Sequence, residues 1–174
     1  MKYRTIVFTV LMSASLASWA QTPSAAAAGA QPPAPPARGP SLELALEAAQ
    51  AALTECKTRE QKIGVSVVDS AGVLKVLLAS DGASSRGVQS GNNKAVTALT
   101  FKLPSSQLGE KIKTDADLAA KVAANPGLNA RAGGVLLQVN GEIIGAIGVG
   151  GARGSDNDEA CAVSGVKKIQ DRLK

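Results

Sequence analysis

The strongest constraint on the fold is a hairpin signature in the C-terminal third of the chain. Two apolar runs, residues 135–139 and 143–149, flank the dipeptide Asn140-Gly141. Asn-Gly supplies the two positive-φ residues that a type I′ turn requires. A glycine-rich loop follows, with Gly148, Gly150, Gly151 and Gly154, before a helix start at Ser155. The stretch therefore predicts a strand, a tight turn, a strand, a glycine-rich loop and a helix.

Further elements precede this hairpin. Ser41 is placed to cap a helix whose apolar face runs to Cys56. Strands are expected at residues 63–69 and 73–79. Helical segments are expected at residues 85–102 and 105–111, from Thr114 to the breaking sequence Asn125-Pro126-Gly127, and from Ser155 to near Leu173. The segment 105–111 is expected to be only a short helical turn. Without it the order is α-β-β-α-α-β-β-α, which predicts an α+β fold with an antiparallel sheet and helices on its faces.

The N-terminus has the features of an export signal. Lys2 and Arg4 precede an apolar run at residues 5–17, and small residues stand before an expected cleavage point after Ala20. A retained N-terminal anchor is the alternative. Residues 21–40 are rich in alanine and proline and are expected to be a disordered linker. We therefore expect a signal peptide at residues 1–20, the linker, one domain at residues 41–174, a periplasmic or secreted location, and no membrane insertion after cleavage.

Composition excludes several classes of chemistry. The chain has no histidine, and removal of residues 1–20 takes away every Met, Tyr and Trp and leaves Phe101 as the one aromatic residue. The formal charge falls from +5 to +3 on loss of Lys2 and Arg4, and no basic stripe remains to bind nucleic acid. A serine–histidine triad and a zinc site both lack their ligands. We expect no catalytic or metal-ligating residues, and we interpret Asp156, Asp158 and Glu159 as first-turn acids that favour the helix dipole.

The glycines allow two interpretations. Free amides at Gly150 and Gly151, beside Arg153, can hold a carboxylate or phosphate, or the loop is glycine-rich because the backbone turns sharply there. Gly87 and Gly91 weaken the helix at 85–102 and indicate either close backbone packing or the approach of a ligand.

Two cysteines, Cys56 and Cys161, stand on the first and last expected helices. In an oxidising compartment they predict a disulfide between these helices, and two buried free thiols are the alternative.

Four segments of the sequence resemble the GlcG/HbpS family, also known as the haem-degrading or PduO-C-terminal-like domain. In family order, they are VSVVDSAGVLKVLLASDGA (65–83), NKAVTALTFKLPSS (93–106), GGVLLQVNGEIIGAIGVGGA (133–152) and DNDEACAVSGVKKI (156–169). The exported form, with a cysteine in the first helix, is similar to the periplasmic branch. The resemblance implies a single α+β domain that assembles into a homo-oligomer, haem binding in some members, and a sensor-protein partner in one.

The resemblance favours an exported, non-catalytic protein that binds haem or another small molecule. Without histidine, the iron of a haem would have to take a cysteine, Lys94 or Thr97, and arginine or lysine side chains would pair with its propionates. The expected ligand-binding residues are Arg86, Lys94, Thr97, Phe101, Gly133, Gly134, Gly150, Gly151 and Arg153. Two other functions remain open: an enzyme or accessory protein acting on a small anionic metabolite of the hydroxy-acid type, and a protein-interaction module of a sensing system.

Overall fold

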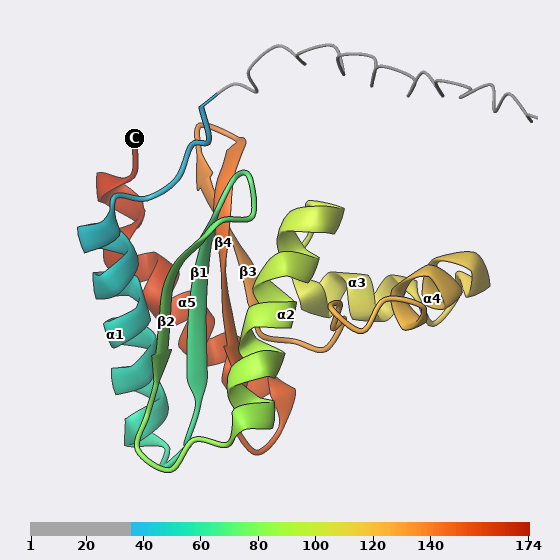
Figure 1. Ribbon diagram of the computed structural model, residues 1–174, viewed down its shortest axis with the longest axis horizontal. Coiled ribbons are helices and arrows are strands. Elements are labelled where there is room, and N and C mark those ends of the chain that lie inside the picture. Colours follow the sequence, from blue (N-terminus) through green and yellow to red (C-terminus); the bar gives the residue numbers. More distant parts are fainter. Residues whose placement is uncertain (1–35) are drawn as a thin grey trace, which may run out of the picture. The chain divides into compact units, whose positions relative to one another are not determined.

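The structure is a computed structural model that describes residues 36–174. The expected signal peptide and most of the expected linker, residues 1–35, lie outside the described residues and are drawn in grey in Figure 1.

A four-stranded antiparallel sheet forms the centre of the fold (Figure 1). Its strands are β1 (Gly64–Asp69), β2 (Leu74–Ala79), β3 (Gly134–Val139) and β4 (Glu142–Gly150), in the order β2-β1-β4-β3. The two predicted hairpins, β1–β2 and β3–β4, are confirmed, and the turn of the second has positive φ at Asn140 (50°) and Gly141 (84°). The pairing of β1 with β4 joins the hairpins into one sheet, with Val67 opposite Ile147.

Helices cover both faces of this sheet (Figure 1). The bounds are α1 (Leu42–Thr58), α2 (Ser85–Phe101), α3 (Ser105–Lys111), α4 (Ala116–Ala123) and α5 (Ser155–Ile169), followed by a 3₁₀ turn (Gln170–Arg172). The predicted α+β class is confirmed, with one helix more than the counted order because the segment predicted as a short helical turn is the helix α3. Among residues 36–174, no helix is long and apolar enough to cross a membrane.

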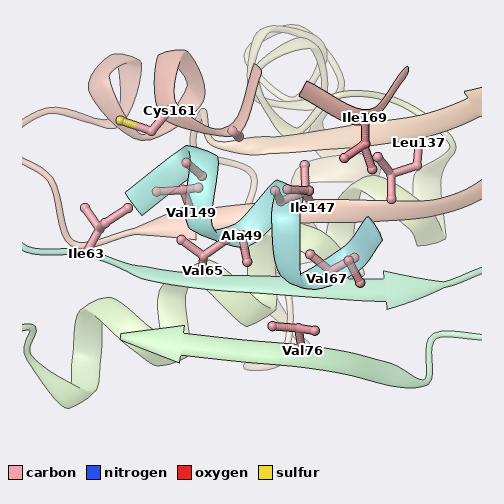
Figure 2. Close-up of a cluster of buried hydrophobic side chains, with 14 of the residues drawn as sticks. Ala49, Ile63, Val65, Val67, Val76, Leu137, Ile147, Val149, Cys161 and Ile169 are labelled. Carbon is pink, nitrogen blue, oxygen red and sulfur yellow. The ribbon is translucent and has the colours of Figure 1, made fainter. Parts of the chain in front are cut away.

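The larger core lies between α1, α5 and the sheet. Four alanines of α1 are fully buried, and their small side chains let the helix approach the branched side chains of β1 and β4 closely. Figure 2 shows this cluster, including Ala49, Val65, Val67, Ile147 and Val149.

A disulfide ties the same two helices together. Cys56 of α1 and Cys161 of α5 are bonded, with their Cα atoms 5.6 Å apart, and both residues are fully buried. This confirms the predicted bridge.

The opposite face carries α2, packed almost backbone to backbone on β1 and β4. A Cβ atom added to Gly91 would lie 2.8 Å from the carbonyl oxygen of Gly64, and one added to Gly150 would lie 2.5 Å from that of Gly87. Such distances leave no room for a side chain, so Gly91 allows close backbone packing; Gly87 also packs closely, with an added Cβ 2.9 Å from the Gly151 Cα, and in addition lines the cavity described below. This packing brings the middle of α2 to the edge of the sheet near the start of β3.

One helix start differs from the sequence prediction and one agrees with it: α4 begins at Ala116 rather than at Thr114, and α5 begins at Ser155 as predicted. Asp115, not Thr114, caps α4, and its Oδ1 accepts from the Leu118 amide at 2.9 Å. Helix α5 begins after Gly154, whose φ is 87°, and no side chain caps its first turn. The first turn of α5 therefore retains backbone amides without a capping side chain.

Candidate functional site

A polar cavity of about 390 Å³ lies where the N-terminal ends of α2 and α5 meet the loop before β3. Its lining comprises Ser84, Arg86, Gly87, Ser90, Lys94, Asn129, Arg131, Gly151, Ala152, Ser155 and Asp158. Three cationic side chains and one carboxylate give this lining a formal charge of +2 (three minus one). We call it the Lys94–Asp158 cavity.

The buried ion pair that names the cavity joins α2 to α5. Lys94 Nζ donates to Asp158 Oδ2 at 2.6 Å, and the two residues are only 1% and 3% exposed. The other carboxylate oxygen, Oδ1, accepts from the Ala152 amide at 2.9 Å, which fixes the plane of the carboxyl group. The pair therefore has one geometry, set by two helices and the loop after β4.

Burial shifts the pKa of both members of this pair. Removal from water lowers the pKa of the Lys94 ammonium below its usual range, although the hydrogen bond to Asp158 opposes this change. Burial likewise raises the pKa of the Asp158 carboxyl against the opposing effect of Lys94. Both shifts favour the neutral forms, so the transfer of a proton from Lys94 to Asp158 costs less here than in water.

Arg131 is brought to the cavity by a network centred on Asn129. The Asn129 amide donates to Thr97 Oγ1 at 2.7 Å, and its Nδ2 donates to Ser90 Oγ at 3.0 Å. Asn129 Oδ1 accepts from the Arg131 amide at 3.1 Å, and the Arg131 carbonyl accepts from Ser105 Oγ at 2.7 Å. These bonds anchor the loop on α2 and α3, so the backbone of Arg131 is held while its side chain is exposed.

The two arginines of the cavity are free to bind a ligand. Within residues 36–174, neither the Arg86 nor the Arg131 guanidinium makes an ion pair or a hydrogen bond to another side chain, and both residues are exposed. Guanidinium groups bind carboxylates and phosphates in a bidentate manner. The N-terminal turns of α2 and α5 add the positive ends of two helix dipoles to the same cavity. The arrangement suits a small anion.

Three of the predicted ligand-binding residues line this cavity, namely Arg86, Lys94 and Gly151. Gly133 and Gly134 lie behind the ion pair: a Cβ atom on Gly133 would be 2.9 Å from Lys94 Nζ. Gly150 lies beneath α2 in the same close-packed manner. Gly133 and Gly134 therefore leave room for Lys94, and Gly150 leaves room for the first half of α2.

The remaining predicted residues lie elsewhere. Thr97 is fully buried, with its hydroxyl donating to the Asn93 carbonyl at 2.6 Å and accepting from Asn129. Phe101 is at the C-terminal end of α2, with the Lys121 ammonium 5.9 Å from its ring centre. Arg153 is exposed on the glycine-rich loop and is not part of the cavity lining.

Asp158 is the residue whose role the sequence reasoning missed. We expected it to serve the helix dipole, whereas the structure buries it against Lys94. The helical spacing could have revealed that Asp158 is buried, because Cys161 and Ala162 lie three and four residues later on the buried face of α5. An acid in register with that face points inward and needs a buried cation.

A larger, shallower groove of about 700 Å³ adjoins the cavity and shares Asn129, Arg131 and Ser155 with it. Its other walls come from α3, α4 and the loop after α4, and they include the apolar side chains of Ile112, Val122 and Leu128.

The donor set of the cavity does not fit a haem iron. The chain has no histidine, and both cysteines are in the disulfide. Lys94 is paired with Asp158, and the Thr97 hydroxyl is used twice within the protein. The one aromatic ring after residue 20 lies outside the lining, so the cavity offers neither an available axial ligand nor a stacking surface.

Comparison with known proteins supports the family resemblance. The profile of the family described as "Haem degrading protein HbpS-like" matches residues 41–167. No curated protein sequence matches the chain. A crystal structure of a double mutant of HbpS from Streptomyces reticuli is 32% identical, with a TM-score of 0.69, and the match covers 85% of this chain and 97% of that one.

Two more distant structures share the fold. The complex of PduOC with heme is 20% identical (TM-score 0.70; 78% of this chain and 97% of that one). The ORFY protein of Klebsiella pneumoniae is 21% identical (TM-score 0.72; 83% and 99%). Profile, identity and coverage agree, and this chain is a member of the HbpS-like family.

Proposed function

We propose that this protein is an exported, non-catalytic binding protein of the HbpS-like family, and that its ligand is a small carboxylate-bearing metabolite held in the Lys94–Asp158 cavity. The observation that carries the proposal is the pair of arginines, Arg86 and Arg131, unpaired within residues 36–174 on a cavity of formal charge +2. The signal-peptide features of residues 1–20 support export.

The size and chemistry of the cavity define the ligand class. About 390 Å³ is at the lower end of the range for ligand sites and suits a short-chain acid. The carboxylate pairs with the guanidinium groups, and the hydroxyls of Ser84, Ser90 and Ser155 are available to a hydroxyl or carbonyl oxygen. A hydroxy acid or an oxo acid meets both requirements.

Isothermal titration with lactate and with pyruvate tests this proposal. Loss of a charge-assisted hydrogen bond costs about 1.5–3 kcal/mol, so Arg131→Gln is expected to weaken binding about 10- to 100-fold. Arg153→Gln is the matched control, since Arg153 is exposed on the neighbouring loop and lies outside the cavity lining. Equal affinities for wild type and Arg131→Gln would refute the assignment of the site.

Haem is the second candidate, favoured by the family to which the chain belongs and by the adjoining groove of about 700 Å³ with its apolar wall. Haemin titration followed at the Soret band separates the two ligands. A saturable, shifted band favours haem, whereas a flat or unsaturable response leaves the carboxylate proposal alone.

A further inference from the structure

The Lys94–Asp158 cavity contains one amine and no other activated nucleophile. Ser84, Ser90 and Ser155 have hydroxyls, but the chain has no histidine to serve as their base. Lys94 has its base in place, because Asp158 Oδ2 lies 2.6 Å from Nζ. Asp158 is in turn oriented by the Ala152 amide, so nucleophile, base and orienting group form a connected set.

We propose that Lys94 forms a reversible imine with the carbonyl carbon of a small oxo acid whose carboxylate is held by Arg86 and Arg131. The inference rests on the proposed function, since it uses the same cavity, and it adds a covalent step and a preference for a carbonyl compound.

The ion pair alone can carry out every proton transfer that imine formation requires. Asp158 takes a proton from the Lys94 ammonium, and the free amine forms a C–N bond while the carbonyl electron pair moves to oxygen. Asp158 returns the proton to that oxygen and accepts a second proton from nitrogen. It then delivers this proton to the departing hydroxyl, and water leaves as the C=N bond forms. The net reaction converts an ammonium and a carbonyl into an iminium and one water, with Asp158 ionised at both ends.

Electrostatics favours this chemistry at Lys94 over surface lysines. Burial lowers the pKa of the amine, and the positive charge of Arg131 acts in the same direction. The product iminium is again a cation opposite Asp158, so the buried carboxylate keeps its partner. A neutral adduct would leave that charge unpaired, which is strongly unfavourable.

Reductive trapping tests the proposal. The protein is incubated with pyruvate and cyanoborohydride, which reduces an iminium to a stable amine, then digested and examined by mass spectrometry. One adduct per chain is expected, on the peptide that contains Lys94, and excess lactate, which has the carboxylate but no carbonyl, should suppress it. Lys94→Arg keeps a cation opposite Asp158 without a nucleophilic amine and should abolish the adduct.

The outcomes separate this inference from the proposed function. Adducts spread over exposed lysines alike in wild type and Lys94→Arg overturn the imine. Lactate binding by calorimetry without any Lys94 adduct also overturns the imine and leaves the carboxylate site standing. Absence of both binding and adduct overturns both. Lactate competition is measured on wild type, so the test does not depend on the folding of a variant.

Discussion

At the scale of single residues, the proposed site depends on the buried Lys94–Asp158 pair. Two charges less than 5% exposed have lost most of their hydration, and their mutual attraction roughly offsets that loss. Such a pair adds little net stability, yet neither partner can be removed alone. We infer that the pair shapes the cavity and adds little to the free energy of unfolding.

Removal of one partner should therefore lower the free energy of unfolding much more than removal of both. Lys94→Met leaves the Asp158 carboxylate buried without a cation and is expected to lower the free energy of unfolding by about 3–5 kcal/mol. The double change Lys94→Met with Asp158→Leu is expected to be close to neutral or stabilising. Urea unfolding of the three proteins measures both, and a double variant as unstable as the single one would contradict the assignment.

The same pair predicts a specific pH dependence. Just above pH 3.8, the folded chain keeps a proton on Asp158 that the unfolded chain releases, so the free energy of unfolding falls as pH rises through that window. Just below pH 10.5, the unfolded chain binds a proton that folded Lys94 has lost, so the free energy of unfolding rises with pH.

Melting temperatures across the pH range should thus show a shallow minimum between the two windows. The Lys94→Met, Asp158→Leu protein serves as reference, because it lacks both titrations while keeping the rest of the chain. Parallel profiles for the two proteins would show that the pair does not titrate as described.

At the scale of elements, the contact of α2 with the sheet depends on glycines rather than on large apolar side chains. Gly91→Ala places a methyl group 2.8 Å from the Gly64 carbonyl and should cost about 1–3 kcal/mol, despite the higher helix propensity of alanine. Thr100→Ala, at an exposed position of the same helix, should change stability by no more than about 0.5 kcal/mol. Chemical denaturation compares them, and a stabilising Gly91→Ala would refute the tight contact.

On the other face of the sheet, the disulfide between Cys56 and Cys161 joins α1 to α5. It closes a long loop, since Cys56 and Cys161 are 105 residues apart, and its constraint acts largely on the unfolded chain. Replacement of both cysteines by alanine should lower the free energy of unfolding by about 2–5 kcal/mol. Denaturation with and without reductant provides the check: wild type in reductant should approach the double variant, and no difference would contradict a structural role.

Most of the elements could be predicted from the sequence because their signals are local. The Asn140-Gly141 turn, the Ser41 cap and the short apolar runs of the strands are properties of a few neighbouring residues. The pairing of β1 with β4 is non-local, and nothing in either strand specifies its partner. The cavity is non-local too, because Lys94 and Asp158 are 64 residues apart in sequence, and Arg131 reaches them only through the contacts of Asn129. The glycine-rich loop suggested an anion site at Gly150, Gly151 and Arg153, and of these three only Gly151 is part of the cavity lining.

At the scale of the whole molecule, the edge strand β2 and the residue before it leave apolar side chains uncovered. Val73, Leu74 and Leu77 are each about half exposed. A domain of this size gains stability by burying such surface between copies, which supports the expected homo-oligomer. Light scattering at micromolar concentration should give at least twice the mass of one chain, and Leu77→Lys should lower it. A monomeric wild type would contradict this prediction.

We propose that the Lys94–Asp158 cavity binds a small carboxylate through its two arginines, and a crystal structure of the protein with bound lactate is the decisive test. The carboxylate is expected within hydrogen-bonding distance, about 3 Å, of the Arg86 and Arg131 guanidinium groups, beside the intact ion pair. Lactate bound away from both arginines, or absent at saturating concentration, would contradict it.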